Sequence, residues 1–192
     1  MSFVIDPRKN WARAEALLSE ETDPRRRQIL EMIIKHSKSE AAADFETLMS
    51  TVAPNAHYHS YAAADPEMNA ANSPEGKAEV AAYYTGIVES GCQLLEHDVE
   101  RMVVGHDQIT TEGELRMAYP GAVLIAMGFE VPDPDALYLY QQRLLIVWEF
   151  DQDGLVLCED SYGAAGSVGF EGISDRRIQP EEIYRVSSQD VA

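Results

Sequence analysis

The chain has 192 residues, of which 45% are hydrophobic and 25% are charged, and its formal net charge is −18. This length and composition are typical of one globular domain with a sizeable core, and they argue against long disordered regions. The negative charge repels phosphate backbones and anionic lipid surfaces, so we expect neither nucleic acid nor a membrane as a partner.

Two Asp-Pro pairs predict the first two helices. Asp6-Pro7 begins a short helix through about Glu20, and Asp23-Pro24 begins a second, each with an aspartate N-cap and a proline in the first turn. In the second helix His36 follows Met32 by four residues on an apolar face. We therefore expect His36 to point inward.

The next segment changes from helix to strand. Residues 41–52 continue as a helical piece that Pro54-Asn55 ends. A short polar and aromatic strand is expected from His57 to Tyr61, followed by a loop over 62–75. Alternation along this strand separates Tyr58 and Ser60 from His57, His59 and Tyr61.

A capped helix and a hairpin follow. Ser73-Pro74-Glu75 predicts the start of a helix with an apolar stripe, and Gly91 its end. The hydrophobic period then changes from helical to two. Residues 95–104 and 109–119 therefore predict a β-hairpin.

The C-terminal part adds two longer strands. Residues 120–136 are an apolar excursion, either a pocket lid or an interface segment, before strands over 138–150 and 155–162. This order of elements predicts an α+β fold with the helices on one face of a curved sheet. The expected divisions are an N-terminal helical extension at 1–22, a domain at 23–162 and an irregular tail at 163–192.

The cysteines and the chain start indicate the compartment. Cys92 and Cys158 belong to no CxxC or Cys/His ligand pattern, so we expect free buried thiols in a reducing cytosol, with a disulfide as the open alternative. The N-terminal sequence lacks a signal-peptide core, and no apolar run approaches the roughly 20 residues that span a bilayer. We expect a cytoplasmic protein.

Short motifs in a characteristic order connect this chain to a known family. The motifs are Ala43-Asp44-Phe45, Ala53-Pro54-Asn55-Ala56, Gly76, Trp148-Glu149-Phe150 and Gly154-Leu155-Val156. Between about Arg25 and Tyr162 the chain resembles the NTF2-like superfamily, in its SnoaL-like and scytalone-dehydratase-like branch. The resemblance implies a cone, in which a curved antiparallel sheet wraps around helices and encloses an apolar pocket.

Members of that superfamily include dehydratases, ketosteroid isomerases, epoxide hydrolases, polyketide cyclases and binding proteins without catalysis. The fold therefore names no reaction by itself. The resemblance implies a small, largely apolar organic ligand, no cofactor and a homodimer.

Ketosteroid isomerases differ from this chain at each functional position. Where that family has an oxyanion-donating tyrosine, a proton-shuttling aspartate and a protonated acid, this chain has His36, Ser60 and Ile146. Isomerisation by that mechanism is therefore not expected.

Scytalone dehydratase gives a mixed comparison. His97 matches its first catalytic histidine, whereas Tyr119 stands at the second and Ser60 at a pocket tyrosine. Ala41 replaces the aspartate that orients a histidine, and Glu40 lies beside it. His97 is thus the retained functional position.

From these positions we predict a cofactor-independent acid/base enzyme of dehydratase, isomerase or cyclase type. His97 is the candidate general base and acid, because imidazole titrates near neutrality. Tyr119 is expected to donate to a substrate oxygen, and His36 to polarise one. The candidate substrate-binding residues are Tyr58, Ser60, Glu40 and Asp160.

Each candidate has an alternative, structural interpretation. The ring of His97 could bond to backbone alone, His36 could be a neutral histidine satisfied by a hydroxyl, and Asp160 could pair with Arg143. The whole protein would then be a non-catalytic small-molecule-binding or interaction protein on the same fold. The missing acid at Ala41 favours that alternative.

The strand histidines raise the question of a metal. His57 and His59 form an HxH pair, but no third His, Cys or carboxylate stands at a ligand-like spacing. We therefore expect no metal site. The family resemblance places Tyr58 and Ser60 in the pocket, which implies that both histidine rings face the outer surface of the sheet.

Overall fold

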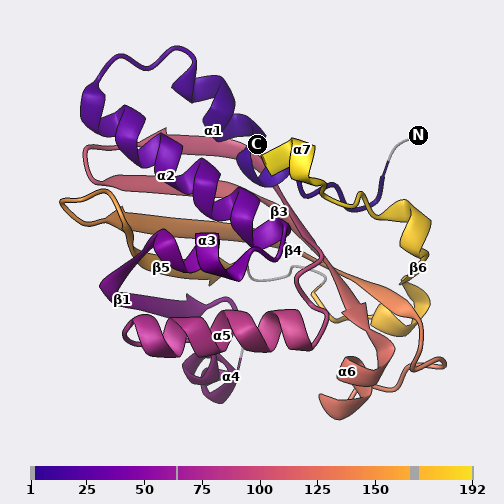
Figure 1. Ribbon diagram of the computed structural model, residues 1–192. Helices are drawn as coiled ribbons and strands as arrows, with labels where there is room; N and C mark the ends of the chain where they lie inside the picture. The colour runs from indigo at the N-terminus through magenta and orange to yellow at the C-terminus, as the bar shows by residue number, and fades with distance from the viewer. Residues whose placement is uncertain (1–2, 64, 165–168, 192) are drawn as a thin grey trace.

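The structure, a computed structural model, describes residues 3–63, 65–164 and 169–191. In this part helices cross one face of a curved sheet (Figure 1). The helices are α1 (Lys9–Leu18), α2 (Pro24–Ala41), α3 (Phe45–Ser50), α4 (Pro66–Ala71), α5 (Lys77–Glu89), α6 (Gly121–Ala126) and α7 (Ser188–Val191), with 3-10 turns η1 (Ile173–Asp175) and η2 (Pro180–Glu182). The strands are β1 (Val52–Tyr61), β2 (Leu95–Val104), β3 (Gln108–Pro120), β4 (Leu137–Phe150), β5 (Val156–Gly163) and β6 (Arg177–Ile178).

The predicted α+β architecture is confirmed, with one refinement in the sheet. The strand order is β1-β5-β4-β3-β2, and β6 pairs with β4. Neighbours from β2 to β5 are antiparallel, as expected, but β1 runs parallel to β5. Because β1 joins the sheet beside the last long strand, residues far apart in sequence become direct neighbours.

Helix α2 begins as its sequence predicts. The Asp23 side chain accepts hydrogen bonds from the backbone N–H groups of Arg25 and Arg26, and Pro24 occupies the first turn. Pro54, by contrast, does not end a helix but lies inside β1. A proline is compatible with this strand because β1 is at the edge of the sheet, where a missing N–H breaks no ladder.

The segment after β1 is more ordered than expected. Helix α4 lies within the predicted loop, and the side chain of Asp65 caps it by accepting from Glu67 N–H. Ser73 does not cap α5, whose N-cap is Gly76 at φ 80°. The Ser73 hydroxyl instead accepts the Ser60 backbone N–H at 2.9 Å and so holds α4 against β1.

The core lies between α2, α5 and the concave face of the sheet. Along β4 buried and half-buried side chains alternate over the whole strand, as period two requires. From α2, Ile29 and Leu30 are fully buried in this core, and Val80 of α5 belongs to the same cluster of buried side chains. Each such side chain contributes about 2 kcal/mol of hydrophobic free energy.

The expected irregular tail is attached at several points where it is described. Gly169 bridges Gln141 of β4, and Ile178 of β6 pairs with Leu137. The N-terminal segment joins it through a parallel bridge between Ile5 and Ile183. Among the described helices, none is both long and apolar enough to cross a membrane.

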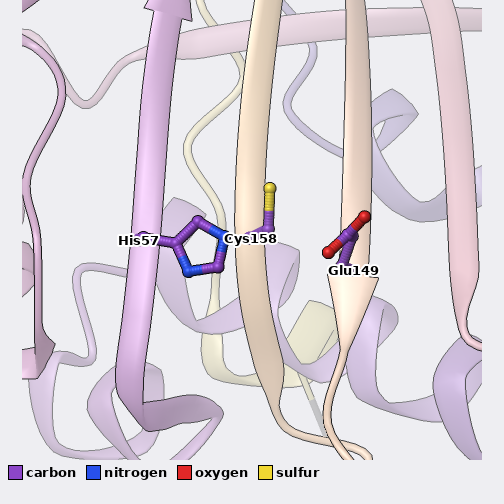
Figure 2. A group of neighbouring side chains, drawn as sticks. All are labelled: His57, Glu149 and Cys158. Atoms are coloured by element: carbon purple, nitrogen blue, oxygen red, sulfur yellow. The ribbon is translucent and has the colours of Figure 1, made fainter.

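The two faces of the sheet carry different side chains. His57 of β1, Cys158 of β5 and Glu149 of β4 project to the same side of three adjacent strands (Figure 2). Tyr58 and Glu159, the next residues along β1 and β5, project to the opposite, helix-covered side.

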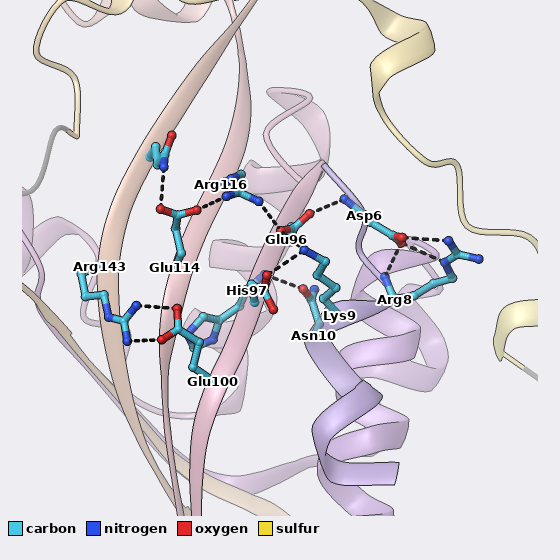
Figure 3. A network of polar contacts seen from close by, with 12 residues as sticks. Asp6, Arg8, Lys9, Asn10, Glu96, His97, Glu100, Glu114, Arg116 and Arg143 are labelled. Atoms are coloured by element: carbon cyan, nitrogen blue, oxygen red, sulfur yellow. Dashed lines mark hydrogen bonds and ion pairs between the residues drawn. The ribbon is translucent and has the colours of Figure 1, made fainter. Parts of the chain in front are cut away.

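A fully buried carboxylate anchors the N-terminal segment to the sheet. Glu96 on β2 accepts the Asp6 backbone N–H at 2.6 Å, the Lys9 ammonium at 3.1 Å and the Arg116 guanidinium at 2.7 Å (Figure 3). Two cations and one N–H offset the cost of removing this carboxylate from water. The Glu96 contacts therefore position α1 against β2.

We predict that Glu96→Gln lowers the free energy of unfolding by about 3 kcal/mol, because two cations lose a buried counter-charge. Denaturant unfolding measures the effect. The control is Asp98→Asn, which removes the other partner of Lys9; the Asp98 side chain is 41% exposed, and we expect a loss below about 1 kcal/mol. Equal losses for the two variants would contradict the anchoring role of Glu96.

Candidate functional site

A cavity of about 1060 Å³ lies between the helices and the concave face of the sheet. Helices α2 and α5 and strands β1 to β5 contribute to its wall, and Asn10 of α1 reaches it as well. The apolar wall includes Ile33, Ile87, Leu95, Val99, Leu115, Met117, Leu144, Ile146, Trp148 and Phe170. The principal polar side chains are Glu40, Tyr58, Ser60, Tyr83, His97, Thr111, Tyr119, Gln142 and Glu159.

Two carboxyl groups face this largely apolar space. Glu40 lies at the C-terminal end of α2, and Glu159 lies on β5 opposite Tyr58 in the strand register. Among the described residues the Glu40 carboxyl has no hydrogen-bond partner. Burial raises the pKa of Glu40 to about 7; burial and the neighbouring Glu40 charge raise the pKa of Glu159 to about 8.

Glu159 is joined to a chain of buried hydrogen bonds. The Tyr84 hydroxyl lies 3.1 Å from Glu159 Oε2 and 3.0 Å from His36 Nε2. On its other side His36 Nδ1 lies 2.7 Å from Thr51 Oγ1, which donates to the Leu48 carbonyl at 2.6 Å. Helix α5, helix α2 and strand β5 thus meet in one polar chain.

The positions of the protons in this chain follow from its geometry. Because Thr51 donates its only proton to Leu48, His36 Nδ1 must donate to Thr51. Burial lowers the pKa of His36 to about 4, so the ring is neutral and its Nε2 is an acceptor. The single proton of Tyr84 therefore has two competing acceptors, His36 and Glu159.

Protonation of Glu159 resolves this competition. When Glu159 is ionised, Tyr84 donates to it and His36 Nε2 is left without a donor. When Glu159 carries a proton, that proton reaches the Tyr84 oxygen and Tyr84 donates to His36, so every member is satisfied. The hydrogen-bond geometry and the raised pKa both favour a neutral Glu159 at pH 7.

His97 reaches the cavity wall but has no acid partner. Its backbone N–H donates to Asn10 Oδ1 at 2.6 Å, and its ring is 6% exposed. Nε2 has no hydrogen-bond partner among the described residues, and no described carboxylate bonds to the ring, so Glu40 does not orient it. Burial lowers the pKa of His97 to about 4, which makes the ring a neutral hydrogen-bonding group.

Other predicted site residues are placed differently. His36 does not line the cavity, because both ring nitrogens are occupied by Thr51 and Tyr84. The prediction that it polarises a substrate oxygen is therefore replaced by the alternative of a buried histidine satisfied by hydroxyls. Tyr119 does line the cavity, in edge contact with Phe170 at 5.2 Å between ring centroids.

Two candidates on β1 and β5 remain. Ser60 lines the cavity, and its hydroxyl donates to Asn69 of α4 at 3.3 Å. Asp160 is not part of the cavity wall: it projects to the outer face and binds His59 Nδ1 at 2.8 Å. Arg143, its expected partner, forms ion pairs with Glu100 and Glu112. The expectation that Asp160 binds substrate is corrected by this placement.

Glu159 and Tyr84 are the residues that sequence reasoning missed. The Tyr84 hydroxyl links Glu159 to His36. A usable signal was present for Glu159, since alternation along β5 places it and Ser161 on one face and Asp160 on the other.

Comparisons with known proteins agree with this architecture. A profile of the SnoaL-like domain family matches residues 35–157. A putative SnoaL-like polyketide cyclase from Shewanella putrefaciens has a similar structure, with a TM-score of 0.59 and 12% identity over 92% of this chain and 96% of that chain. No curated protein sequence matches significantly.

Two mycobacterial structures are also similar. Rv0760c from Mycobacterium tuberculosis, in complex with estradiol-17β-hemisuccinate, has a TM-score of 0.53 and 14% identity over 72% of this chain and 95% of that chain. Δ5-3-ketosteroid isomerase from a Mycobacterium species has a TM-score of 0.53 and 15% identity, covering 70% of this chain and 92% of that chain. At these identities the likeness establishes the fold alone.

We predict that stability falls as pH rises from 5 to 8, and that Glu159→Gln removes part of this fall. The unfolded chain ionises Glu159 near its ordinary pKa of 4.5, whereas the folded protein keeps the proton to about 8. Rising pH therefore favours unfolding, by about 3 to 4 kcal/mol for this group. Urea unfolding of the wild type and of Glu159→Gln across this pH range measures the effect. The control is Glu89→Gln, at an exposed glutamate. Parallel pH profiles for wild type and Glu159→Gln would contradict the assignment.

Proposed function

Since the chain belongs to the SnoaL-like domain family, we propose that it is a cofactor-independent acid/base enzyme of isomerase, cyclase or dehydratase type. The observation that carries this proposal is the pair of carboxyl groups, Glu40 and Glu159, in the wall of an apolar cavity. Carboxyls with pKa values of about 7 and about 8 exchange protons near neutral pH, which general acid/base catalysis requires.

Glu40 is the proposed general base. Its carboxyl faces the cavity with no hydrogen-bond partner among the described residues, so in the ionised form its oxygens are free to take a proton from a bound molecule. His97, the base expected from sequence, is a weaker base because burial lowers its pKa to about 4. We therefore transfer the base role from His97 to Glu40 and retain His97 as a hydrogen-bonding group for a substrate oxygen.

Glu159 is the proposed proton donor. Tyr84 and His36 hold the carboxyl in place and favour its protonated form. A substrate oxygen that gains negative charge can accept the Glu159 proton, and the Tyr84 hydroxyl then turns from His36 to donate to the ionised carboxylate. His36 and Tyr84 act here as positioning residues, and the hydroxyls of Tyr58 and Tyr119 are further donors in the wall.

The size and lining of the cavity also indicate which class of ligand it could bind. A volume of about 1060 Å³ with apolar walls suits an organic molecule of several fused rings that carries one or two oxygens. The steroid ester bound by Rv0760c is of this kind, on a similar fold. We propose a ring-containing apolar substrate with a carbonyl or a hydroxyl group.

The second candidate function is ligand binding without catalysis. The missing carboxylate partner of His97 favours it, as does the replacement of the ketosteroid-isomerase residues by His36, Ser60 and Ile146. The two functions differ in one respect: binding requires the cavity alone, whereas turnover requires ionisable Glu40.

We predict that estradiol-17β-hemisuccinate, used as a probe, quenches Trp148 fluorescence with micromolar affinity. Trp148 lines the cavity and Trp11 does not, so a Trp11→Phe background isolates the signal. Leu115→Phe, which fills part of the cavity, should weaken binding at least about tenfold. Quenching that is identical in the Leu115→Phe variant would place the probe outside the cavity.

We further predict that the protein accelerates proton exchange next to the carbonyl of a Δ5-3-ketosteroid probe in deuterated buffer. Glu40→Gln should lower this rate by about 10² to 10⁴ and leave probe binding within about threefold. The wild-type rate should rise with pH through about 7, as Glu40 loses its proton.

The matched control for that experiment is Glu46→Gln, an exposed glutamate on α3, which should leave the rate unchanged. Binding without exchange above the buffer rate would reject the enzyme and favour the binding protein. Absence of both would contradict the proposed ligand class.

A further inference from the structure

Three potential metal ligands meet on the outer face of the sheet. In the strand register Cys158 of β5 stands directly between His57 of β1 and Glu149 of β4. One ligand atom from each side chain lies within 4.8 Å of the other two (Figure 2). None of the three residues lines the cavity, so this cluster is separate from the site described above.

The donor set is that of a borderline-soft divalent cation. Zinc accepts imidazole nitrogen, thiolate sulfur and carboxylate oxygen, and three protein ligands leave one position for water. Donors bound to one tetrahedral zinc stand about 3.5 Å apart. The observed separations therefore need only small side-chain rotations to close around an ion.

The electrostatics of the cluster also favour a cation. The carboxyl groups of Glu149 and Asp160 lie beside the Cys158 thiol on the outer face of the sheet. A divalent ion would compensate their negative charge and stabilise the deprotonated form of the thiol.

Neighbouring side chains already orient the candidate ligands. Gln108 donates to Glu149 Oε1 at 2.8 Å, which leaves Oε2 for an ion. Asp160, beside the thiol, is fixed by His59 Nδ1 at 2.8 Å. The ring nitrogens of His57 make no hydrogen bond among the described residues. In metal sites the ligands are usually oriented by hydrogen bonds from neighbouring residues in this way.

From this geometry we propose that His57, Cys158 and Glu149 bind one divalent transition-metal ion of the Zn²⁺ class. Binding transfers the thiol proton of Cys158 to the buffer and links edge strand β1 to β5 and β4. This assignment replaces the expectation of no metal site, and it does not depend on the proposed enzymatic function. His59, the other member of the HxH pair, supports the site without binding the ion.

Cobalt binding tests the proposal directly. Untagged, chelator-treated protein is titrated with Co²⁺, and we expect one ion per chain, a thiolate-to-cobalt charge-transfer band, and release of about one proton. Zn²⁺ should displace the cobalt and raise the melting temperature. A wild-type protein without the charge-transfer band would overturn the proposal.

The variants distinguish this cluster from other thiols and histidines. Cys158→Ser should lose the charge-transfer band, whereas Cys92→Ser, at the other buried thiol, should keep it. His57→Gln and Glu149→Gln should weaken cobalt binding at least about tenfold, and exposed His106→Gln should have no effect. These two half-buried positions keep the test valid if Cys158→Ser fails to fold. An unchanged cobalt affinity in both the His57→Gln and the Glu149→Gln variant would overturn the proposed metal site.

Discussion

The candidate site depends on one constraint: an ionised carboxylate is costly inside an apolar cavity. Such a group either holds its proton to a higher pH or is surrounded by hydrogen-bond donors. Glu159 is hydrogen-bonded to Tyr84, which is bonded in turn to His36, and His36 to Thr51. The hydrogen bonds that favour the protonated form of Glu159 also hold α2 and α5 against the sheet.

Much of the fold was predictable from sequence because its elements have clear periods. Alternation along 95–119 and 138–162 fixed the long strands, and Asp23-Pro24 fixed the start of α2. Pro54 was misinterpreted because a single sequence reveals neither that β1 is an edge strand nor that its register shifts between Val52 and His57, and proline is tolerated in a sheet at such positions.

The site was only partly predictable, for a different physical reason. Period two separated Tyr58 from the histidines of β1, and the family resemblance assigned Tyr58 to the cavity wall; in the structure Tyr58 lines the cavity, but so does His59 from the other set. The partners of His36 and the placement of Cys158 between His57 and Glu149 depend on tertiary packing and on parallel pairing of β1 with β5. No local pattern encodes those contacts. Adjacent residues of strand β5 therefore belong to two different candidate sites. Glu159 faces the cavity, and Cys158 faces the outer surface of the sheet.

The most direct test of this account is the ionisation of Glu159 itself. Carboxyl carbon chemical shifts of the protein labelled with ¹³C at glutamate carboxyls, assigned by difference from Glu159→Gln, follow this group as pH is varied. The account predicts that Glu159 remains protonated at pH 7 and titrates near pH 8. A Glu159 resonance that titrates near the ordinary value of 4.5 would contradict both the proton order in the chain and the proposed acid.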